Sequence, residues 1–400
     1  MLGHRCLYNP RPILLSIPMC MVRAGTVTLC LQCLPRLLAC HAGQAEAAWL
    51  FSGRTEGSRT MLSNELPAMR TPYKLDAGEG KRFRFGGHLA TIIATPAELG
   101  QTASGTVLSG AKGAKFPLHR HQASHEAMFV LEGVVALSLA GCSYLLTQSD
   151  YVNIPAGTPH GYEFVDHRGK LLSWTFGGNA ADAYERIGGK YPGNVYAETG
   201  ESVDWSALSS GVDTELAAEE GGKSDHTAEK LTVAPEGMLP FVLAAGEGER
   251  MIAADQLYTI LGNQTHSNGV FITLLTEGPI GPAIPRHQHE KVTELFHCLN
   301  GQMEMFAGDG MVAIDPGDFL HIPPRTPHSF QLKKHDTRFL GMITPGHFEP
   351  FFRYLCDPFE GYRYPLVPPP FRFDRVIQNL NELDLTILER LGGPPAGSAG

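Results

Sequence analysis

The chain has 400 residues, of which 43% are hydrophobic and 18% charged, so it is long enough for two ordinary domains and too apolar to be disordered throughout. Its formal net charge is −9 and it contains no long basic run, which excludes nucleic acid from the expected partners. The 45 glycines and 29 prolines indicate many short strands joined by turns rather than long helices.

The first 65 residues differ from the rest, and we expect a disordered N-terminal extension over 1–65. No acidic residue precedes Glu46, while arginines are spread through apolar sequence. Arg23 and Arg36 interrupt the apolar stretches, which argues against a membrane span and therefore against a membrane partner. The cysteines form no disulfide framework, so the cytoplasm is the expected compartment. The arginine-rich, acid-poor bias leaves a mitochondrial presequence or secretion open as alternatives.

Short β-rich runs separated by turn residues begin at about residue 72. Examples are "GHLATIIAT", "AMFVLEGVVALSLAG", "SYLLTQSDYVNIPAG" and "LLSWTFGG". Glycine, proline or a Ser-Asp pair separates these runs. Closely spaced strands of this kind predict an all-β sandwich or barrel.

Three histidines and a glutamate fall within eight residues at the start of one of these runs. His119 and His121 are two residues apart, so in a strand both side chains point to the same face. Glu126 lies at an odd spacing from them, so a turn or bulge must intervene before Glu126 opens the next strand facing inward. His160 follows a Pro-Ala-Gly-Thr-Pro segment that restricts its backbone. Three imidazoles and one carboxylate suit a divalent first-row transition metal and leave coordination positions for a substrate or a small gas.

The same pattern returns 168 residues later, which indicates a duplicated domain. "PYKLDAGEGKRF" returns as "PFVLAAGEGERM", and "SDYVNIPAGTPH" returns as "GDFLHIPPRTPH". His125 is not repeated, because Thr293 stands in its place, so we interpret His125 as a residue that does not bind metal. The repeat predicts two domains, 66–196 and 237–350, with a second set of metal ligands at His287, His289, Glu294 and His328.

Two segments lie outside the repeat. Residues 197–236 are acidic and rich in Gly and Ser, which is typical of a solvated linker. The C-terminal extension, 351–400, contains a helical pattern that predicts a helix over 374–391 with Asp374 as its N-cap. One face of that helix would pack across the two domains or at a dimer interface, and its apolar residues are Val376, Leu380, Leu383 and Ile387.

The motif His119-x-His121-x4-Glu126-x6-Gly133, followed by Pro155-x-Gly157-x2-His160, resembles the two cupin motifs, and two copies make a bicupin. Over residues 70–390 the chain resembles the quercetin 2,3-dioxygenase family of bicupins, through segments such as "PYKLDAGEGKRFRFGGHLATIIA", "YVNIPAGTPHGYEF", "ELFHCLNGQMEMF" and "PGHFEPFFRYLCDPFEGYRYP". Two departures stand out. Ser149 replaces the glycine that usually opens the second motif, and Arg325 replaces a motif glycine in the second copy, where we expect it to crowd the site.

The resemblance implies an all-β bicupin of two jelly-roll-like barrels with a C-terminal helix, and one divalent metal in each cupin domain. Iron is the first expectation, and manganese, copper, nickel and cobalt are the alternatives. The implied reaction is ring cleavage of a flavonol such as quercetin, in which the 3-hydroxyl binds the metal, dioxygen adds across the heterocycle, carbon monoxide leaves and a depside remains. Glu126 would be both ligand and general base, and the first copy the site of turnover. An apolar slot for the flat substrate would be formed by Met128, Val130, Tyr162 and Phe164.

Two other classes of function stay open at this point. A bicupin resembling oxalate decarboxylase would use the same ligands on a small carboxylic acid, and would need a cation near the first site. Arg120 is the only nearby candidate, and it alternates outward. A non-enzymatic metal-binding bicupin is the other alternative, although this chain keeps all eight ligands. A homodimer is possible for each of these functions.

Overall fold

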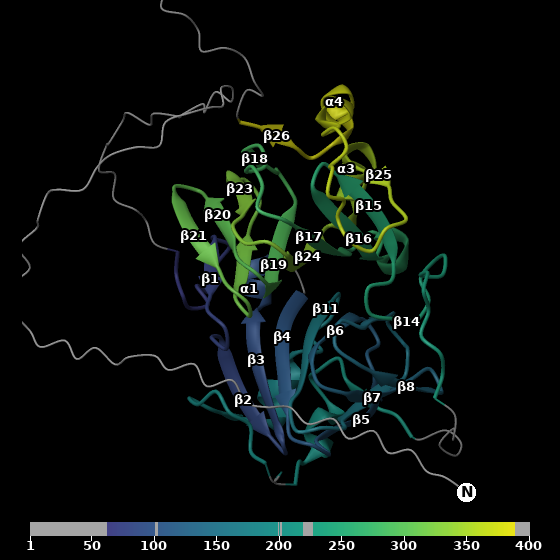
Figure 1. Cartoon of the computed structure of the whole chain (residues 1–400). Coiled ribbons are helices and arrows are strands. Elements are labelled where there is room, and N and C mark those ends of the chain that lie inside the picture. The colour runs from purple at the N-terminus through teal and green to yellow at the C-terminus, as the bar shows by residue number, and fades with distance from the viewer. Residues whose placement is uncertain (1–61, 101–102, 199, 201, 219–226, 389–400) are drawn as a thin grey trace, which may run out of the picture. The chain divides into compact units, whose positions relative to one another are not determined.

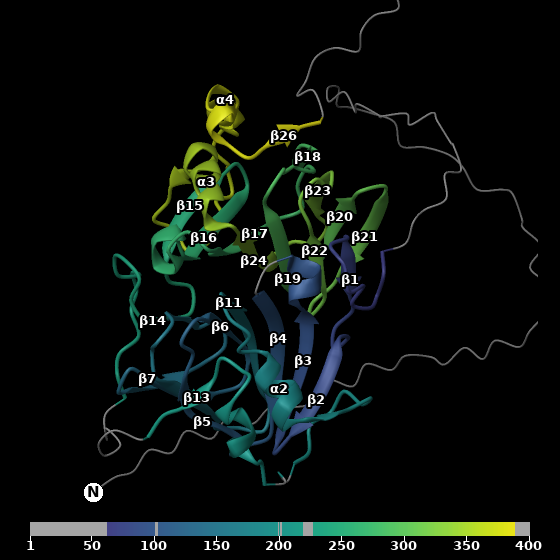
Figure 2. The same cartoon turned by 180° about the vertical axis from the view of Figure 1, so that it is seen from behind.

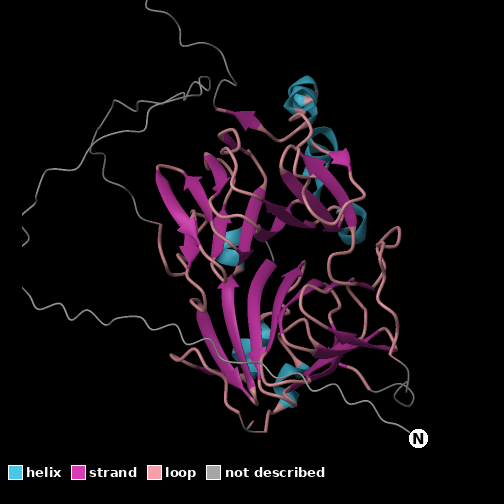
Figure 3. Cartoon of the chain, in the orientation of Figure 1, coloured by secondary structure: helices cyan, strands magenta, loops and turns pink. Residues whose placement is uncertain are grey.

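The computed structural model describes residues 62–100, 103–198, 200, 202–218 and 227–388. Most of the extension expected over 1–65 therefore lies outside the described residues. Antiparallel strands are the main regular secondary structure of the described chain (Figure 3), and the expected all-β architecture is confirmed. No described helix is long and apolar enough to cross a membrane.

The first domain consists of two antiparallel sheets in a jelly-roll-like arrangement. The larger sheet has the order β12-β2-β3-β4-β11-β6-β9-β14, and the smaller has the order β13-β5-β10-β7-β8. Strands β2, β3 and β4 lie side by side in Figure 1. Strand β7 alternates between buried and more exposed residues, as a strand with one solvated face should. The bounds are β2 Lys81–Phe85, β3 His88–Ala94, β4 Ala103–Gly110, β5 Lys115–Arg120, β6 His125–Glu132, β7 Val135–Leu139, β8 Cys142–Leu146, β9 Tyr151–Ile154, β10 His160–Phe164, β11 Gly169–Phe176, β12 Gly189–Lys190 and β13 Glu215–Leu216.

The second domain repeats this arrangement. Its larger sheet has the order β1-β22-β19-β24-β17-β16-β15-β25, and its smaller sheet has the order β21-β20-β23-β18-β26. The bounds are β15 Glu249–Ala253, β16 Gln256–Gly262, β17 Ile272–Gly278, β18 His287–Gln288, β19 Thr293–Asn300, β20 Met303–Ala307, β21 Gly310–Ile314, β22 Phe319–Ile322, β23 His328–Leu332, β24 Thr337–Thr344, β25 Asp357–Pro358 and β26 Thr386–Ile387.

Each domain lends one short strand to the other. Strand β1 (Tyr73–Leu75) pairs with β22 of the second domain, and β14 (Phe241–Leu243) pairs with β9 of the first. Figures 1 and 2 show both strands beside their partner sheets from opposite sides. The structural domains therefore differ from the predicted 66–196 and 237–350, since the first strand of each segment belongs to the other domain. Each added strand pairs with what would otherwise be an unpaired sheet edge.

The predicted helix over 374–391 is wrong for most of its length. A short helix α4 (Phe373–Gln378) is followed by a 3-10 turn η4 (Leu380–Glu382) and by β26. Asp374 lies inside α4, whose N-cap is Arg372. The helix ends early because Asp384 accepts three hydrogen bonds from backbone N–H groups of the loop after β18, and β26 then pairs with β18. The other helical elements are α1 Pro96–Leu99, α2 Asp182–Ile187, α3 Pro350–Leu355, η1 Trp205–Ser209, η2 Gln264–Ser267 and η3 Gly346–Phe348.

Part of the segment predicted as a solvated linker, 197–236, packs against the first domain. The ring of Trp205 in η1 lies 5.0 Å from the ring of Phe116, and Leu208 is buried. Strand β13 then pairs with β5. The acidic, Gly- and Ser-rich composition did not indicate this packing. The segment is the structural counterpart of the C-terminal extension, because Asp213 in the one and Asp384 in the other bind the loop after the first ligand strand of each domain.

We expect the folded chain to lose stability in acid because of two buried histidines between the domains. Burial lowers the pKa of His297 and of His321 to about 4. Because an unfolded histidine titrates near pH 6.5, the unfolded chain takes up these protons first, and the stabilisation present above pH 6.5 is lost as the pH falls towards 4. We expect the free energy of unfolding to fall over this window by up to about 3 kcal/mol per histidine.

Urea unfolding between pH 7.5 and 4.5 measures this effect. The control is a variant that carries the residues found at the matching positions of the first domain, His297→Phe with His321→Asn. Its unfolding free energy should depend less on pH, and an identical slope in both proteins would show that these histidines are not responsible.

Candidate metal centres

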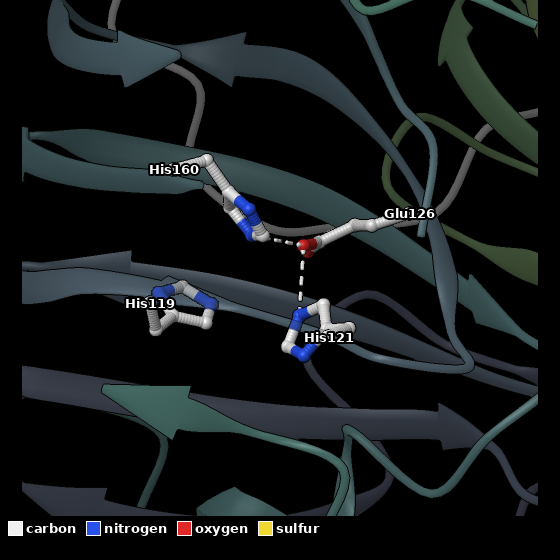
Figure 4. A group of neighbouring side chains, drawn as sticks. All are labelled: His119, His121, Glu126 and His160. Atoms are coloured by element: carbon white, nitrogen blue, oxygen red, sulfur yellow. Dashed lines mark hydrogen bonds and ion pairs between the residues drawn. The ribbon is translucent and has the colours of Figure 1, made fainter. Parts of the chain in front are cut away.

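The first cluster brings together four side chains from three strands and one loop. His119 lies near the end of β5 and His121 follows just beyond it, while His160 opens β10 and pairs in register with His119. Glu126 is the second residue of β6, after the turn that the spacing required. The four ligand atoms lie within 4.8 Å of one another, and all four side chains are buried. Figure 4 shows them converging on a common space.

The hydrogen bonds of the three imidazoles orient them for metal binding. Each Nδ1 lies against a backbone carbonyl, at 2.9 Å for His119, 2.6 Å for His121 and 2.9 Å for His160. A carbonyl only accepts, so Nδ1 carries the proton and each Nε2 offers a lone pair to the cluster. The Nε2 atom of His160 nevertheless lies 2.9 Å from Oε2 of Glu126. Two lone-pair donors this close repel each other unless a proton or a metal cation lies between them, and three imidazoles with one carboxylate are a donor set that fits a divalent metal.

The second cluster repeats the first in the second domain. Nδ1 lies 2.8 Å from a carbonyl oxygen in His287, 2.5 Å in His289 and 2.8 Å in His328. Nε2 of His328 lies 3.1 Å from Oε2 of Glu294, and Nε2 of His289 is buried without a hydrogen-bond partner. An unsatisfied buried nitrogen that faces other ligand atoms is the arrangement expected of a metal site. The structure therefore gathers the eight histidines and glutamates that the sequence indicated into two clusters of four.

The protonation states of the first cluster also suit a metal. Burial lowers the pKa of His119 well below its usual value, and the neighbouring His160 and His121 lower it further. Burial alone would raise the pKa of Glu126, but the adjoining imidazoles of His121 and His160 hold it well below the usual range. A neutral imidazole and an ionised carboxylate are the forms that bind metal, and His119 and Glu126 favour these forms. Burial lowers the pKa of His121, but the contact with Glu126 outweighs burial and leaves that pKa raised, so a metal would displace a proton there.

Two aspartates that the sequence analysis missed hold the ligand loops in place. The Asp213 carboxylate accepts hydrogen bonds from the backbone N–H groups of residues 122–124, and its carbonyl oxygen accepts the Nδ1 proton of His121. Asp384 does the same for residues 290–292 and for His289. These residues lie 171 rather than 168 apart, so the fixed register of the repeat could not reveal them.

Replacing Asp384 by Ala should weaken metal binding at the second centre by about 10- to 100-fold, since groups that orient a metal ligand typically have effects of this size. The loop at 290–292 loses its anchor, while the four ligands remain. Metal affinity measured by competition with a chelator tests this expectation. Asp374→Ala, in the exposed first turn of α4, is the matched control and should leave the affinity unchanged. Equal affinities in the native chain and in Asp384→Ala would contradict the proposed role.

The four residues expected to line a substrate slot divide into two pairs. Met128 and Tyr162 line a cavity of about 10 Å³ beside His119 and Glu126, which we call the first cavity. Val130 and Phe164 are fully buried in the core of the first domain and do not line it. Other lining residues that the sequence analysis missed are Phe116, Thr175, Ala180, Ala183, Tyr184 and Thr214.

The departures from the cupin motifs leave the ligands undisturbed. Ser149 and Arg325 both adopt left-handed backbone conformations, with φ of 73° and 65°, in places where glycine is usual. The expectation that Arg325 crowds the second site is wrong, because its side chain is largely exposed and pairs with Glu290. The backbone N–H of Arg325 donates to the carbonyl of His289 at 2.6 Å, as that of Gly157 does to His121.

His125 stands apart from the cluster, in agreement with its interpretation as a residue that does not bind metal. Its Nε2 lies 2.9 Å from Oδ1 of Asn153, and its ring packs edge-on against Phe271. Arg120 also points away, since its guanidinium pairs with Glu215 at the surface. Neither side chain therefore takes part in the first centre.

Comparisons with known proteins agree with the duplicated geometry. The family model described as "Cupin domain" matches residues 107–174 and again 274–340. The chain is 42% identical over 335 residues to quercetin 2,3-dioxygenase of Bacillus subtilis (strain 168), an alignment that covers 83% of this chain and 99% of that one. It is 31% identical over 130 residues to quercetin 2,3-dioxygenase of Aspergillus japonicus, covering 30% of this chain and 37% of that one.

Among solved structures, oxalate decarboxylase from Bacillus subtilis at pH 4.6 is similar with a TM-score of 0.44. Its sequence identity is 16%, and the alignment covers 68% of this chain and 75% of that one.

Proposed function

This chain belongs to the quercetin 2,3-dioxygenase family of bicupins, and we propose that it cleaves the heterocyclic ring of a flavonol with dioxygen, leaving a depside and carbon monoxide. The observation that carries the proposal is the complete three-histidine, one-glutamate donor set, present in both domains of a chain aligned with 99% of a named relative. A cupin with only a packing or storage role would have no need to keep eight buried ligands.

One divalent metal per domain is proposed, held by His119, His121, Glu126 and His160 in the first and by His287, His289, Glu294 and His328 in the second. Iron is our first expectation, and manganese, copper, nickel and cobalt are the alternatives, since a set of imidazole and carboxylate ligands can bind each of them. When bound, the metal would supply Lewis-acid stabilisation of the ionised 3-hydroxyl and a site for dioxygen chemistry.

The cupin glutamate is proposed as both ligand and general base, Glu126 in the first domain as the sequence indicated and Glu294 in the second. A carboxylate needs only to come within hydrogen-bond distance of the flavonol 3-hydroxyl to take its proton. Burial strengthens every electrostatic interaction at that point, and it excludes water that would compete for the ionised substrate. The Nδ1 contacts to carbonyls keep the imidazoles in place during the transfer.

The oxalate-decarboxylase alternative is disfavoured by the cavities beside the two clusters. No lysine or arginine is among the described residues that line either cavity, so a small dianion would find no countercharge there apart from the proposed metal. A flat, largely apolar flavonol requires none. We therefore keep oxalate turnover as an outcome to be measured rather than as a second proposal.

Two assays test the proposed function. Metal-loaded protein is mixed with quercetin in air, and loss of the flavonol absorption band is followed together with carbon monoxide in the headspace. The same preparation is given oxalate, and carbon dioxide and formate are measured. Loss of quercetin with release of carbon monoxide supports the proposal, whereas turnover of oxalate alone would replace it with a decarboxylase function.

The compartment and the assembly are proposed more coarsely. The described cysteines, Cys142, Cys298 and Cys356, are all free thiols, which supports a reducing compartment such as the cytoplasm. A homodimer is compatible with this function, and sedimentation of the full chain tests it.

A further inference from the structure

We infer that the flavonol is bound and cleaved in the second domain, at His287 and Glu294, and that the first domain has too little room for it. This inference rests on the proposed function and narrows it to one of the two domains. It differs from the expectation from the sequence, which favoured the first copy. It depends on the size of the two cavities, on the residues that fill one of them, and on access to the two glutamates.

The cavities beside the two clusters differ greatly in volume. The second cavity measures about 200 Å³ and is bordered by both His287 and Glu294. The first cavity measures about 10 Å³, which is room for about one water molecule. Sites for drug-sized ligands start at about 300 Å³, so the second cavity needs a modest adjustment and the first would need to be rebuilt. Phe371 at the border of the second cavity is 44% exposed and can provide that adjustment.

One substitution between the two copies accounts for part of the difference in volume. Phe85 packs inside the first domain, with its ring 6.0 Å from that of Tyr184 and 6.3 Å from that of Phe116. The residue 168 positions later is Ala253, which borders the second cavity. One benzyl side chain is therefore present in the first domain and missing from the second, and the space it would occupy stays open.

The glutamate of the second cluster, Glu294, is also more accessible to a substrate than Glu126 of the first. In the first domain, Ser173 donates to Oε1 of Glu126 at 2.5 Å while His160 contacts Oε2, so both carboxylate oxygens are engaged. Gly341 occupies the position of Ser173 in the second domain. There, Oε1 of Glu294 has only a 3.4 Å contact with His289. An incoming hydroxyl can therefore reach Glu294 without displacing a protein hydrogen bond.

The lining of the second cavity suits a flat polyphenol. It is lined by the aromatic side chains of Tyr258, Phe296, Phe330 and Phe352, and such a lining favours a planar aromatic ligand. Gln256 and Asp255 supply polar atoms at the border, and the amide oxygen of Gln256 accepts the Tyr258 hydroxyl at 2.9 Å. Hydroxyl groups on the outer ring of a flavonol would find partners there.

An anaerobic titration of the metal-loaded full chain with quercetin tests the inference, because the change in the flavonol absorption band reports binding without turnover. Ala253→Phe introduces the residue of the first domain and should weaken binding at least about tenfold. Phe85→Leu is the matched control in the first domain and should change binding less than about twofold. Metal content and thermal unfolding are measured for each variant to show that both centres and the fold are retained.

Gly341→Ser provides a second, smaller change in case Ala253→Phe does not fold. The atoms nearest to a Cβ at position 341 would be those of the Leu274 side chain, at 3.5 Å, and the Leu274 carbonyl oxygen, at 3.7 Å, which are ordinary contacts, so serine fits there. Its hydroxyl would engage Glu294 as Ser173 engages Glu126, and we expect kcat to fall at least about tenfold with both metals retained. If metal-replete Gly341→Ser turns over quercetin like the native chain, the second domain is not the site. If the native chain itself neither binds nor cleaves quercetin, the proposed function fails instead.

Discussion

The Glu294→Gln variant should cleave quercetin about 10²- to 10⁴-fold more slowly than the native chain, which is the usual loss when a general base is removed. Glutamine keeps the shape of the side chain but has no anionic oxygen to take the proton of the 3-hydroxyl. It is also a poorer ligand, so metal content must be measured beside the rate. The measurement is kcat under saturating quercetin and air, corrected for the metal present in each preparation.

Glu126→Gln is the matched comparison for that experiment, since it makes the same change in a domain where Ser173 and His160 already engage the carboxylate. A loss of turnover confined to Glu126→Gln, with both metals retained, would show that the general base is Glu126 of the first domain, as expected from the sequence. A loss confined to Glu294→Gln would agree with the second cavity as the substrate site.

Removing the metals should destabilise the fold as well as abolish turnover. A metal that binds only the folded chain adds about 2.7 kcal/mol of stability when its free concentration is 100 times its dissociation constant. Without it, the buried imidazoles and carboxylate of each cluster are left without the cation they are arranged around. Chelation should therefore lower the unfolding temperature and stop quercetin cleavage, and both should return when a divalent metal is added back.

Single substitutions separate the contributions of the two centres. We expect His119→Ala and His287→Ala each to lose about half of the bound metal, measured by elemental analysis, because the centres are built from separate ligand sets. A variant that loses both metals together would show that the centres are coupled through the fold. Unchanged metal content in both variants would contradict the assignment of the ligands.

The ligand sets could be predicted from the sequence because their geometry is local. Two histidines two residues apart share a strand face, and the repeat after 168 residues supplied independent support for the same pattern. The strand exchange could not be predicted in this way. Tyr73–Leu75 and Phe241–Leu243 occupy equivalent places in the two copies, and nothing local tells whether such a strand pairs within its own domain or with the other.

The helix expected over 374–391 shows how a tertiary contact overrides a local pattern. The apolar spacing was helical, but Asp384 satisfies three backbone N–H groups beside the second metal centre and needs a non-helical backbone to do so. The cavities could not be predicted from the sequence either. Alternation placed Val130 and Phe164 on the same face as Met128 and Tyr162, but only the packed fold shows which of these core residues border the cavity.

The most direct measurement of the central claim is the cleavage of quercetin under ¹⁸O₂ by the metal-loaded chain, with mass spectrometry of both products. When dioxygen adds across the heterocycle and C3 leaves with its own oxygen, the depside gains both labelled atoms and the carbon monoxide gains none. We predict a doubly labelled depside and unlabelled carbon monoxide. Quercetin consumed without carbon monoxide, or a depside without label, would contradict the assignment of this chain as a flavonol-cleaving dioxygenase.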